Sequence, residues 1–211
     1  MIHMLKFPYY RRSFHAMRRM YNRIYRFYGS IEKSLDPKID AIVLQKIAPL
    51  PDATESTALE YACGSGLLSL KLARYFKSVF SRDLSTGMLM RARARARQAG
   101  VSVSFSEGNI LDISEQPKSY DYVFVSFALH LFPPETEKEI LAKLSSVARK
   151  AVVIIDHGRK WKLSAALVEW FEGEYYDKFI KQDFEPIARE IGRRSFQEDQ
   201  IEDCTVLTFY Q

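Results

Sequence analysis

The sequence has few of the residues that define secreted, zinc-binding or membrane-spanning proteins. Its 211 residues include two cysteines, Cys63 and Cys204, which are too few for a disulfide framework and form no Cys-x-x-Cys pair. No apolar run approaches the roughly 18–20 residues of a bilayer-spanning helix, and Met1–Phe7 lacks the apolar region of a signal peptide. We therefore expect a cytoplasmic protein with reduced cysteines and no metal site.

Acidic residues are absent before Glu32, whereas this first segment is rich in arginine and aromatic side chains. Such an arm can contact an anionic membrane surface or nucleic acid, or it can pack its aromatic stripe on the rest of the chain. The apolar spacing predicts a helix from about Ser13 to a C-cap at Gly29. A second helix is predicted over Pro37–Ile47, with Asp36 as its N-cap.

Predicted strands and helices then alternate, which is typical of a parallel sheet with helices on both faces. Two short alternating segments at the end, Ser195–Gln200 and Thr205–Tyr210, predict an edge hairpin. Between them and the sheet, an aromatic helical region runs from Trp161 to about Ile191. The Arg-Ala run Arg91–Arg97 predicts a solvated helix face. The expected strands are Thr57–Ala62, Ser78–Arg82, Val101–Ser106, Tyr120–Phe127 and Ala151–Ile155, and the expected helices are Leu67–Phe76, Thr86–Ala99 and Pro134–Ala148.

A glycine turn follows the first predicted strand, in the sequence Glu60-Tyr-Ala-Cys-Gly-Ser-Gly66. Gly64 and Gly66 allow a ligand to approach the backbone, and the next helix directs its free N–H groups into the same space. Asp83 ends the second strand, 17 residues after Gly66. In dinucleotide-type folds a carboxylate at this place holds a ribose. The pattern therefore predicts a nucleoside ligand.

Two ligand classes use such a site, the nicotinamide dinucleotides and S-adenosylmethionine. Ser69 stands where the dinucleotide pattern has its third glycine. The carboxylate of Glu60, near the end of the first strand, would repel a pyrophosphate and suits a cationic ligand. These two residues favour S-adenosylmethionine.

Four motifs resemble those of the class I S-adenosylmethionine-dependent methyltransferases: Glu60–Gly66, Arg82–Leu89, Glu107–Ile110 and Tyr120–Phe132. The segment Met20–Tyr28 resembles the entry helix of the ubiquinone and menaquinone biosynthesis subgroup. The resemblance implies a Rossmann-like, doubly wound α/β fold, with a mostly parallel seven-stranded sheet, a C-terminal antiparallel hairpin and an N-terminal helical lid. Residues 1–50 are expected to form the arm or lid, and residues 51–211 the cofactor-binding domain. Cys63, Arg82 and Asn109 depart from the family's pattern, so a non-catalytic cofactor-binding protein stays an alternative.

The resemblance also implies roles for individual residues around the donor and its product, S-adenosylhomocysteine. The turn after the first strand is expected to hold the amino acid end, and Asp83 both ribose hydroxyls. Glu60 is expected to orient the turn or to contact the ammonium group through water. The other expected cofactor-binding residues are Ala62, Cys63, Gly64, Ser65 and Gly66 in the turn, Leu84, Met88, Asn109 and Ile110 around the adenine, and Ser126 at the end of the fourth strand.

Methyl transfer needs alignment and exclusion of water, and a base only for some acceptors. His130, just after the fourth strand, is the first candidate base, and His157 is the second. Tyr21 and Tyr28 are candidates to close over the sulfonium. The aromatic lid favours a small, apolar or aromatic acceptor. An RNA methyltransferase that uses the basic arm is the alternative, and the arm is also a candidate for peripheral membrane contact.

Overall fold

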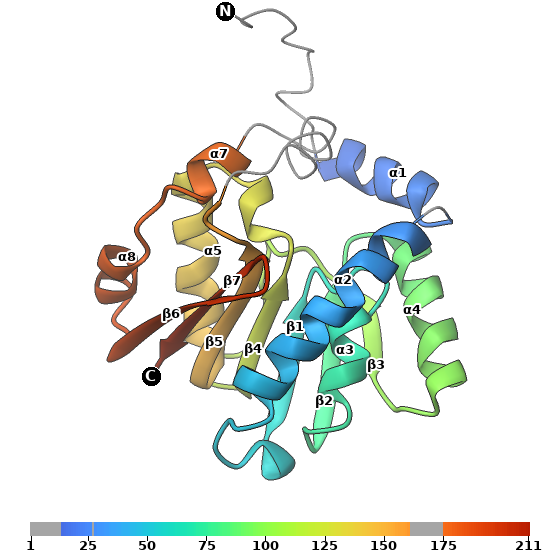
Figure 1. Cartoon of the computed structure of the whole chain (residues 1–211), viewed down its shortest axis with the longest axis horizontal. Helices are drawn as coiled ribbons and strands as arrows, with labels where there is room; N and C mark the ends of the chain where they lie inside the picture. Colours follow the sequence, from blue (N-terminus) through green and yellow to red (C-terminus); the bar gives the residue numbers. More distant parts are fainter. Residues whose placement is uncertain (1–13, 27, 161–174) are drawn as a thin grey trace, which may run out of the picture.

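A seven-stranded sheet with the order β3-β2-β1-β4-β5-β7-β6 runs through the centre of the molecule (Figure 1). The structure is a computed structural model that describes residues 14–26, 28–160 and 175–211. Strands β1 to β5 pair in parallel, β7 runs antiparallel to β5, and β6 runs antiparallel to β7. The strands are β1 (Thr57–Tyr61), β2 (Ser78–Asp83), β3 (Ser104–Glu107), β4 (Tyr120–Ser126), β5 (Ala148–His157), β6 (Ser195–Ile201) and β7 (Cys204–Tyr210).

Helices cover both faces of this sheet (Figure 1). The crossovers explain the two layers, because the chain moves from β1 toward β3 through α3 and α4, and from β4 toward β5 through α5 on the opposite face. The helices are α1 (Phe14–Ile24), α2 (Gly29–Ile42), α3 (Leu67–Leu72), α4 (Thr86–Ala99), α5 (Pro134–Val147), α7 (Tyr176–Phe179) and α8 (Glu185–Glu190), and the shorter turns are η1 (Val43–Ile47), η2 (Ala53–Glu55) and η3 (Leu129–Leu131).

The central strands are buried on both sides, which is why their sequences are continuous apolar runs. Val123, Phe124 and Val125 of β4 are fully buried. One apolar cluster fills the face under α5, α7 and α8, and the other fills the face under α2 and α3. The predicted alternation of strands and helices and the C-terminal hairpin are therefore confirmed, and both cysteines are buried and form no disulfide.

The first two helices differ from the prediction. Helix α1 ends at Ile24, and Gly29 is the first residue of α2 rather than a C-cap. Pro37 lies inside α2, so Asp36 is not an N-cap. The reason is tertiary: Glu32, in the first turn of α2, is buried in an ion pair with Arg91 of α4, and this contact begins the helix earlier than local capping signals indicate.

The arginine run on α4 is also not the uniformly solvated face that we predicted. Arg91 donates two hydrogen bonds to Glu32, at 2.7 and 2.6 Å. Arg95 donates to the backbone oxygen and the Oγ of Ser65 in the glycine turn, both at 3.3 Å. These two side chains point toward the N-terminal helices, which sequence spacing alone did not reveal.

The predicted helical region between Trp161 and Ile191 is only partly within the described residues. Residues 161–174 lie outside them, as does the arm at residues 1–13. After residue 174 this helical region consists of two short helices, α7 and α8, and Pro186 lies in the first turn of α8. None of the helices in the described part of the chain has the length and apolarity required to cross a bilayer.

The boundary at residue 50 between the N-terminal arm and the cofactor-binding domain stays a prediction. Side chains before this boundary nevertheless pack into the core of the sheet. Ile39, Ile42, Val43 and Ile47 are buried in the cluster under α2 and α3. Helix α2 and turn η1 therefore belong to the core that supports the sheet.

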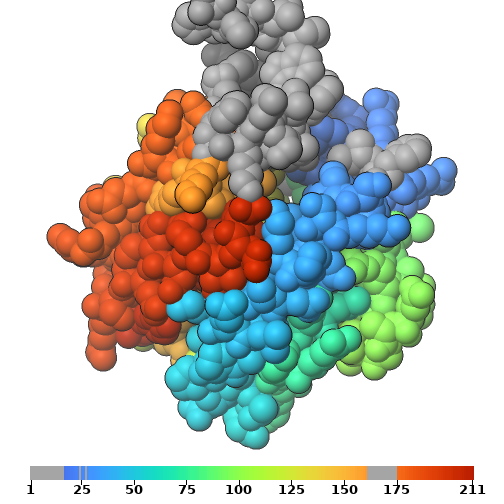
Figure 2. Space-filling view, viewed as in Figure 1, coloured from blue at the N-terminus to red at the C-terminus, as the bar shows by residue number. Residues whose placement is uncertain are grey.

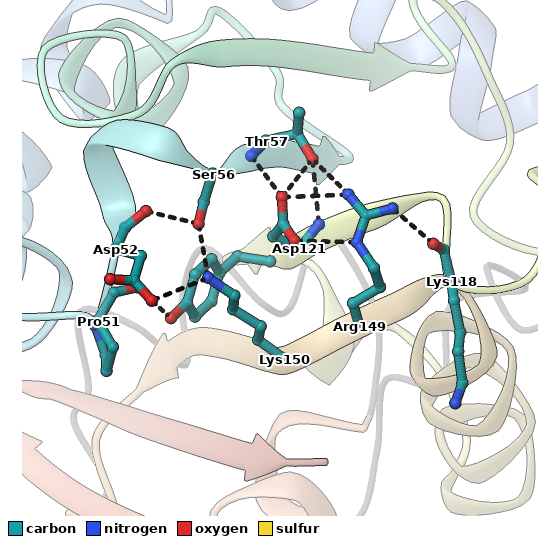
Figure 3. Close-up of polar contacts among 9 residues, drawn as sticks. Pro51, Asp52, Ser56, Thr57, Lys118, Asp121, Arg149 and Lys150 are labelled. Atoms are coloured by element: carbon teal, nitrogen blue, oxygen red, sulfur yellow. Dashed lines mark hydrogen bonds and ion pairs between the residues drawn. The ribbon is translucent and has the colours of Figure 1, made fainter.

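A polar cluster joins the amino ends of β1, β4 and β5 at one edge of the sheet (Figure 3). Asp121 accepts hydrogen bonds from the backbone N–H and the Oγ1 of Thr57, at 2.9 and 3.0 Å. It also accepts from Nε of Arg149 at 2.9 Å. The Arg149 guanidinium holds the pKa of Asp121 well below its usual range. The cluster therefore fixes the order of the three strands from the edge opposite the glycine turn.

We expect Asp121→Asn to lower the free energy of unfolding by about 1–3 kcal/mol, because it leaves Arg149 without its charged partner. The folded-state pKa of Asp121 is depressed, so its stabilisation is complete above the unfolded pKa and is lost as the pH falls through the folded pKa. Urea unfolding at neutral and acidic pH would measure both effects. Equal stability of variant and wild type at neutral pH would contradict the prediction.

Candidate functional site

The carboxyl ends of β1, β2, β3, β4 and β5 meet at one edge of the sheet because these strands are parallel. The chain leaves β1 and β4 toward opposite faces, and ligands of open α/β sheets bind at such a switch point. Two non-glycine residues there have left-handed backbones, Ala62 after β1 with φ 54° and Phe127 after β4 with φ 50°. Such conformations cost energy and cluster at functional sites.

The glycine turn after β1 is tied directly to the end of β2. Oδ2 of Asp83 accepts from the Gly64 backbone N–H at 2.7 Å, and Oδ1 accepts from the Ser85 N–H at 2.8 Å. Gly66 has φ 77°, and a Cβ there would lie 3.0 Å from the Leu70 side chain, so a larger residue would strain the backbone and crowd Leu70. Burial raises the pKa of Asp83 to about 6. One carboxylate therefore joins the turn to the start of α4.

Glu60 is the centre of a buried network beneath the turn. Its carboxylate accepts from the hydroxyl of Ser69 on α3 and from that of Ser126 at the end of β4, the latter at 2.9 Å. Ser81 donates to Ser69 at 3.0 Å. Burial raises the pKa of Glu60 to about 7. Glu60 is thus no surface residue, and Ser69, noted in the sequence as a missing glycine, is its partner.

The residues expected around an adenine lie along the loops after β2 and β3. Met88 and Ile110 are buried and Leu84 is half-buried. The Oδ1 atom of Asn109 accepts from the Leu111 N–H at 3.0 Å and so stabilises its own turn. Cys63 is buried in the glycine turn, which raises the pKa of its thiol. The structure brings these residues to one edge, and their contacts with an adenine stay a prediction.

Arg82, which departs from the family pattern, has a local structural partner. Its Nε donates to Oε1 of Glu115 at 3.0 Å, and Glu115 also accepts from the Tyr61 hydroxyl. A Cβ at Gly108 would lie 2.9 Å from the Arg82 side chain, so this glycine makes room for it. Arg82 therefore anchors the segment after β3 to the sheet and does not by itself indicate a lost cofactor site.

His130 and Asp156 form a buried pair at the ends of β4 and β5. Nδ1 of His130 lies 2.5 Å from Oδ1 of Asp156, and the two side chains are 1% and 0% exposed. Asp156 also accepts from the backbone N–H groups of Leu129, His130 and His157, at 3.1, 3.3 and 2.8 Å. The carboxylate can only accept, so Nδ1 carries the proton and Nε2 is the basic nitrogen of the ring.

His157 lies beside this pair, with its ring centroid 4.7 Å from that of His130 and 5.2 Å from that of Tyr176. Ligand atoms of His130, Asp156 and His157 lie within 4.8 Å of one another, a spacing that can hold a metal ion. Both oxygens of Asp156 are already engaged by N–H groups, so the geometry favours a hydrogen-bonded pair. The expected absence of a metal site stays a prediction.

Glu137 of α5 is a further buried carboxyl group at this edge. Burial, and then the negative charge of Asp156, raises its pKa to about 8. Glu137 is therefore mostly neutral at neutral pH.

The two candidate tyrosines lie on the N-terminal helices. Tyr21 is on α1 and Tyr28 immediately precedes α2, and both are half-buried. Their contact with the sulfonium stays a prediction.

Sequence reasoning missed Asp156 and Ser69. Asp156 had a signal in the sequence, because this carboxylate directly follows the continuous apolar run Ala151–Ile155 near the end of a strand, and Asp83 also lies at a strand end. Ser69 had no such signal in the sequence, because its role depends on a hydrogen bond to Glu60, which lies on a different element.

Comparison with known proteins agrees with this geometry. Residues 58–151 match a family described as a methyltransferase domain. The chain is 29% identical over 98 residues to the chloroplastic magnesium protoporphyrin IX methyltransferase of Arabidopsis thaliana, a stretch that covers 46% of this chain and 31% of that protein. It is 26% identical over 158 residues to the 2-phytyl-1,4-naphtoquinone methyltransferase of Trichormus variabilis, which covers 69% of each chain.

The solved structures agree on the fold. The magnesium protoporphyrin IX methyltransferase of Synechocystis PCC 6803 with bound SAH superposes with a TM-score of 0.71 at 15% identity, over 94% of this chain and 100% of that one. The chain spans 31%, 46% and 63% of the length of three of the curated relatives that it matches, which is less than two thirds of each. The chain therefore contains a methyltransferase domain at residues 58–151, and the Rossmann-like fold around it is shared with a solved methyltransferase structure.

Proposed function

We propose that this protein transfers a methyl group from S-adenosylmethionine to a small-molecule acceptor. The observation that carries the proposal is the bond between Asp83 and Gly64, which brings a ribose-binding carboxylate against a glycine turn. The methyl donor supplies an electrophilic methyl group on a sulfonium. The residues of this chain bind it, align it and keep water away.

The donor site fits the chemistry of such a cofactor. Asp83 presents a buried carboxylate for the ribose hydroxyls. The backbone N–H groups near Ser65 and Gly66, at the start of helix α3, can donate hydrogen bonds to the carboxylate of the methyl donor. Glu60 supplies negative charge beneath the turn, where the ammonium and sulfonium are cationic. Leu84, Met88, Asn109 and Ile110 would enclose the adenine.

His130 is the group that we propose to face the acceptor. Asp156 holds the proton on Nδ1, so Nε2 is left to take a proton from an acceptor hydroxyl or an acidified carbon. Phe127, Tyr176 and Phe179 surround the two histidines with aromatic rings. These surroundings, and the porphyrin and naphthoquinone named for two relatives, favour a planar, apolar acceptor.

An RNA acceptor is the second candidate, because the N-terminal segment is basic. Within the described residues, Arg18, Arg91 and Arg95 are engaged with carboxylates of this chain. Such pairs leave less charge for phosphates, so the small-molecule acceptor is favoured. RNA binding would show a steep dependence on salt.

The function is tested by transfer of labelled methyl from S-adenosylmethionine to a hydroxynaphthoquinone, a porphyrin carboxylic acid and a short RNA. We expect label in one of the two planar compounds. Label found only in RNA would show that the acceptor is RNA and not a small molecule. If calorimetry detected no binding of S-adenosylhomocysteine, the proposal as a whole would be overturned.

Asp83→Asn tests the ribose carboxylate. We expect affinity for S-adenosylhomocysteine to fall about 10- to 100-fold, which is what hydrogen bonds to a charged group contribute. Asp121→Asn, at the opposite edge of the sheet, is the control and should leave that affinity unchanged. If both variants bind like the wild type, Asp83 does not hold the ribose.

The pH dependence of binding follows from the two raised pKa values. Glu60 has a pKa of about 7 and Asp83 of about 6, so both gain protons as the pH falls from neutral and lose the charge that favours the donor. We expect affinity for S-adenosylhomocysteine to fall about tenfold between about pH 8 and about pH 5. Glu60→Gln should remove the part of this change near neutral pH and keep the part at lower pH. A flat calorimetric profile for the wild type would contradict this.

Asp156→Asn tests the pair with His130. The variant cannot hold the Nδ1 proton in the same way, so we expect kcat to fall about 10²- to 10⁴-fold with little change in donor affinity. His130→Gln should give a similar loss. Treatment with EDTA is expected to leave the rate unchanged, and a loss that zinc restores would show instead that His130, Asp156 and His157 bind a metal.

A further inference from the structure

The N-terminal helices contact each of the three loops that form the proposed donor site. Glu32 of α2 reaches the turn after β1 through Arg95, which pairs with Glu32 and donates to Ser65. Asn22 of α1 contacts the start of α4 after β2, and Arg18 pairs with Glu107 at the end of β3, at 2.8 Å. Figure 2 shows α1 and α2, in blue, lying against α4, in green.

Glu32 is a buried, charged group in this contact. Only 9% of its side chain is exposed, and it accepts from Nε and Nη2 of Arg91 at 2.7 and 2.6 Å. Arg95 lies 3.5 Å from the same carboxylate and bonds Ser65 at 3.3 Å. Burial by itself would raise the pKa of Glu32, but hydrogen bonds from Arg91 and Ser65 and the arginine charges lower it. The two hydrogen bonds from Arg91 to Glu32 form a bidentate ion pair, which fixes the relative orientation of the two side chains.

Asn22 makes the second contact. Its Oδ1 accepts from the Ser85 hydroxyl at 2.7 Å and from the Gly87 N–H at 2.9 Å. A Cβ at Gly87 would lie 2.9 Å from the Tyr25 ring, so this close approach requires glycine. Ser85 is also bonded to Asp83 and caps α4. Asn22 is therefore linked to Asp83, the proposed ribose carboxylate, by two hydrogen bonds through Ser85.

We propose that Glu32 and Asn22 are positioning residues for the methyl donor, through which donor binding and docking of α1 and α2 stabilise each other. The inference rests on the proposed donor site at residues 62–66 and 83–88. Ser65 lies between two glycines with left-handed backbones, so the free turn has many conformations and ordering it costs entropy. A turn already held from outside loses less entropy when the donor binds. Coupling of this kind is reciprocal.

The chain contains a matched control for this inference. Lys71 of α3 pairs with Asp40 and Asp36 of α2 at 2.5 and 2.8 Å. These pairs also fasten α2 to the domain, but they do not touch the turn or the start of α4. Removing them changes docking of α2 without changing the support of the donor loops.

The experiment compares Glu32→Gln, Asn22→Ala and Asp40→Asn in the full chain by calorimetry with S-adenosylhomocysteine, with thermal melting to confirm folding. We expect affinity to fall about tenfold in Glu32→Gln and about fivefold in Asn22→Ala, and to stay within about twofold of wild type in Asp40→Asn. Hydrogen exchange should also slow in α2 when S-adenosylhomocysteine binds the wild type, and should not change in Glu32→Gln.

Wild-type affinity in both folded variants would overturn the inference, and so would an equal loss in Asp40→Asn, because the contacts would then act only by fastening α2. If Glu32→Gln does not fold, the affinity of Asn22→Ala for S-adenosylhomocysteine tests the inference by itself. Failure of the wild type itself to bind S-adenosylhomocysteine would overturn the proposed function and this inference together, so the two failures are distinguishable.

Discussion

The bond from the Gly64 amide to the carboxylate of Asp83 is the contact on which the functional edge of the molecule depends. Asp83 holds the turn after β1 with one oxygen and the start of α4 with the other. Ser85, in that start, is the point where Asn22 docks helix α1. A single buried carboxylate thus links two strands, the cofactor turn and the N-terminal helices, because each of its oxygens can accept more than one hydrogen bond.

The two edges of the sheet use carboxylates in opposite ways. At the amino edge, Asp121 is paired with Arg149, and its depressed pKa stabilises the folded chain. At the carboxyl edge, Glu60 and Asp83 are buried and form no ion pair with any described residue, and burial raises both pKa values. This arrangement costs stability and leaves negative charge available for a cationic ligand, as functional sites often do. His130 and Asp156 extend the same edge with a second buried polar pair, where we propose that the acceptor binds.

Much of the fold was accessible from sequence because its signals are local. Continuous apolar strands, the Gly64–Gly66 turn and the Ser85 cap on α4 each depend on neighbouring residues, and the structure confirms them. Predictions failed where a distant partner decided the outcome. Helix α2 begins earlier than predicted, at the turn that carries the buried Glu32, and Pro37 lies inside it. Arg91 and Arg95 pair with Glu32 instead of facing solvent.

The sequence by itself determined the parallel α/β architecture and the donor-type edge, since strand periodicity, glycine placement and the carboxylates of Glu60 and Asp83 are written in consecutive residues. Only the tertiary structure decided which side chains complete that edge. Ser69 faces Glu60, Asp156 faces His130, and Glu32 faces Arg91 from another helix. These pairs join residues 9, 26 and 59 positions apart, and their hydrogen bonds form only when packing of the sheet and its helices brings the partners together.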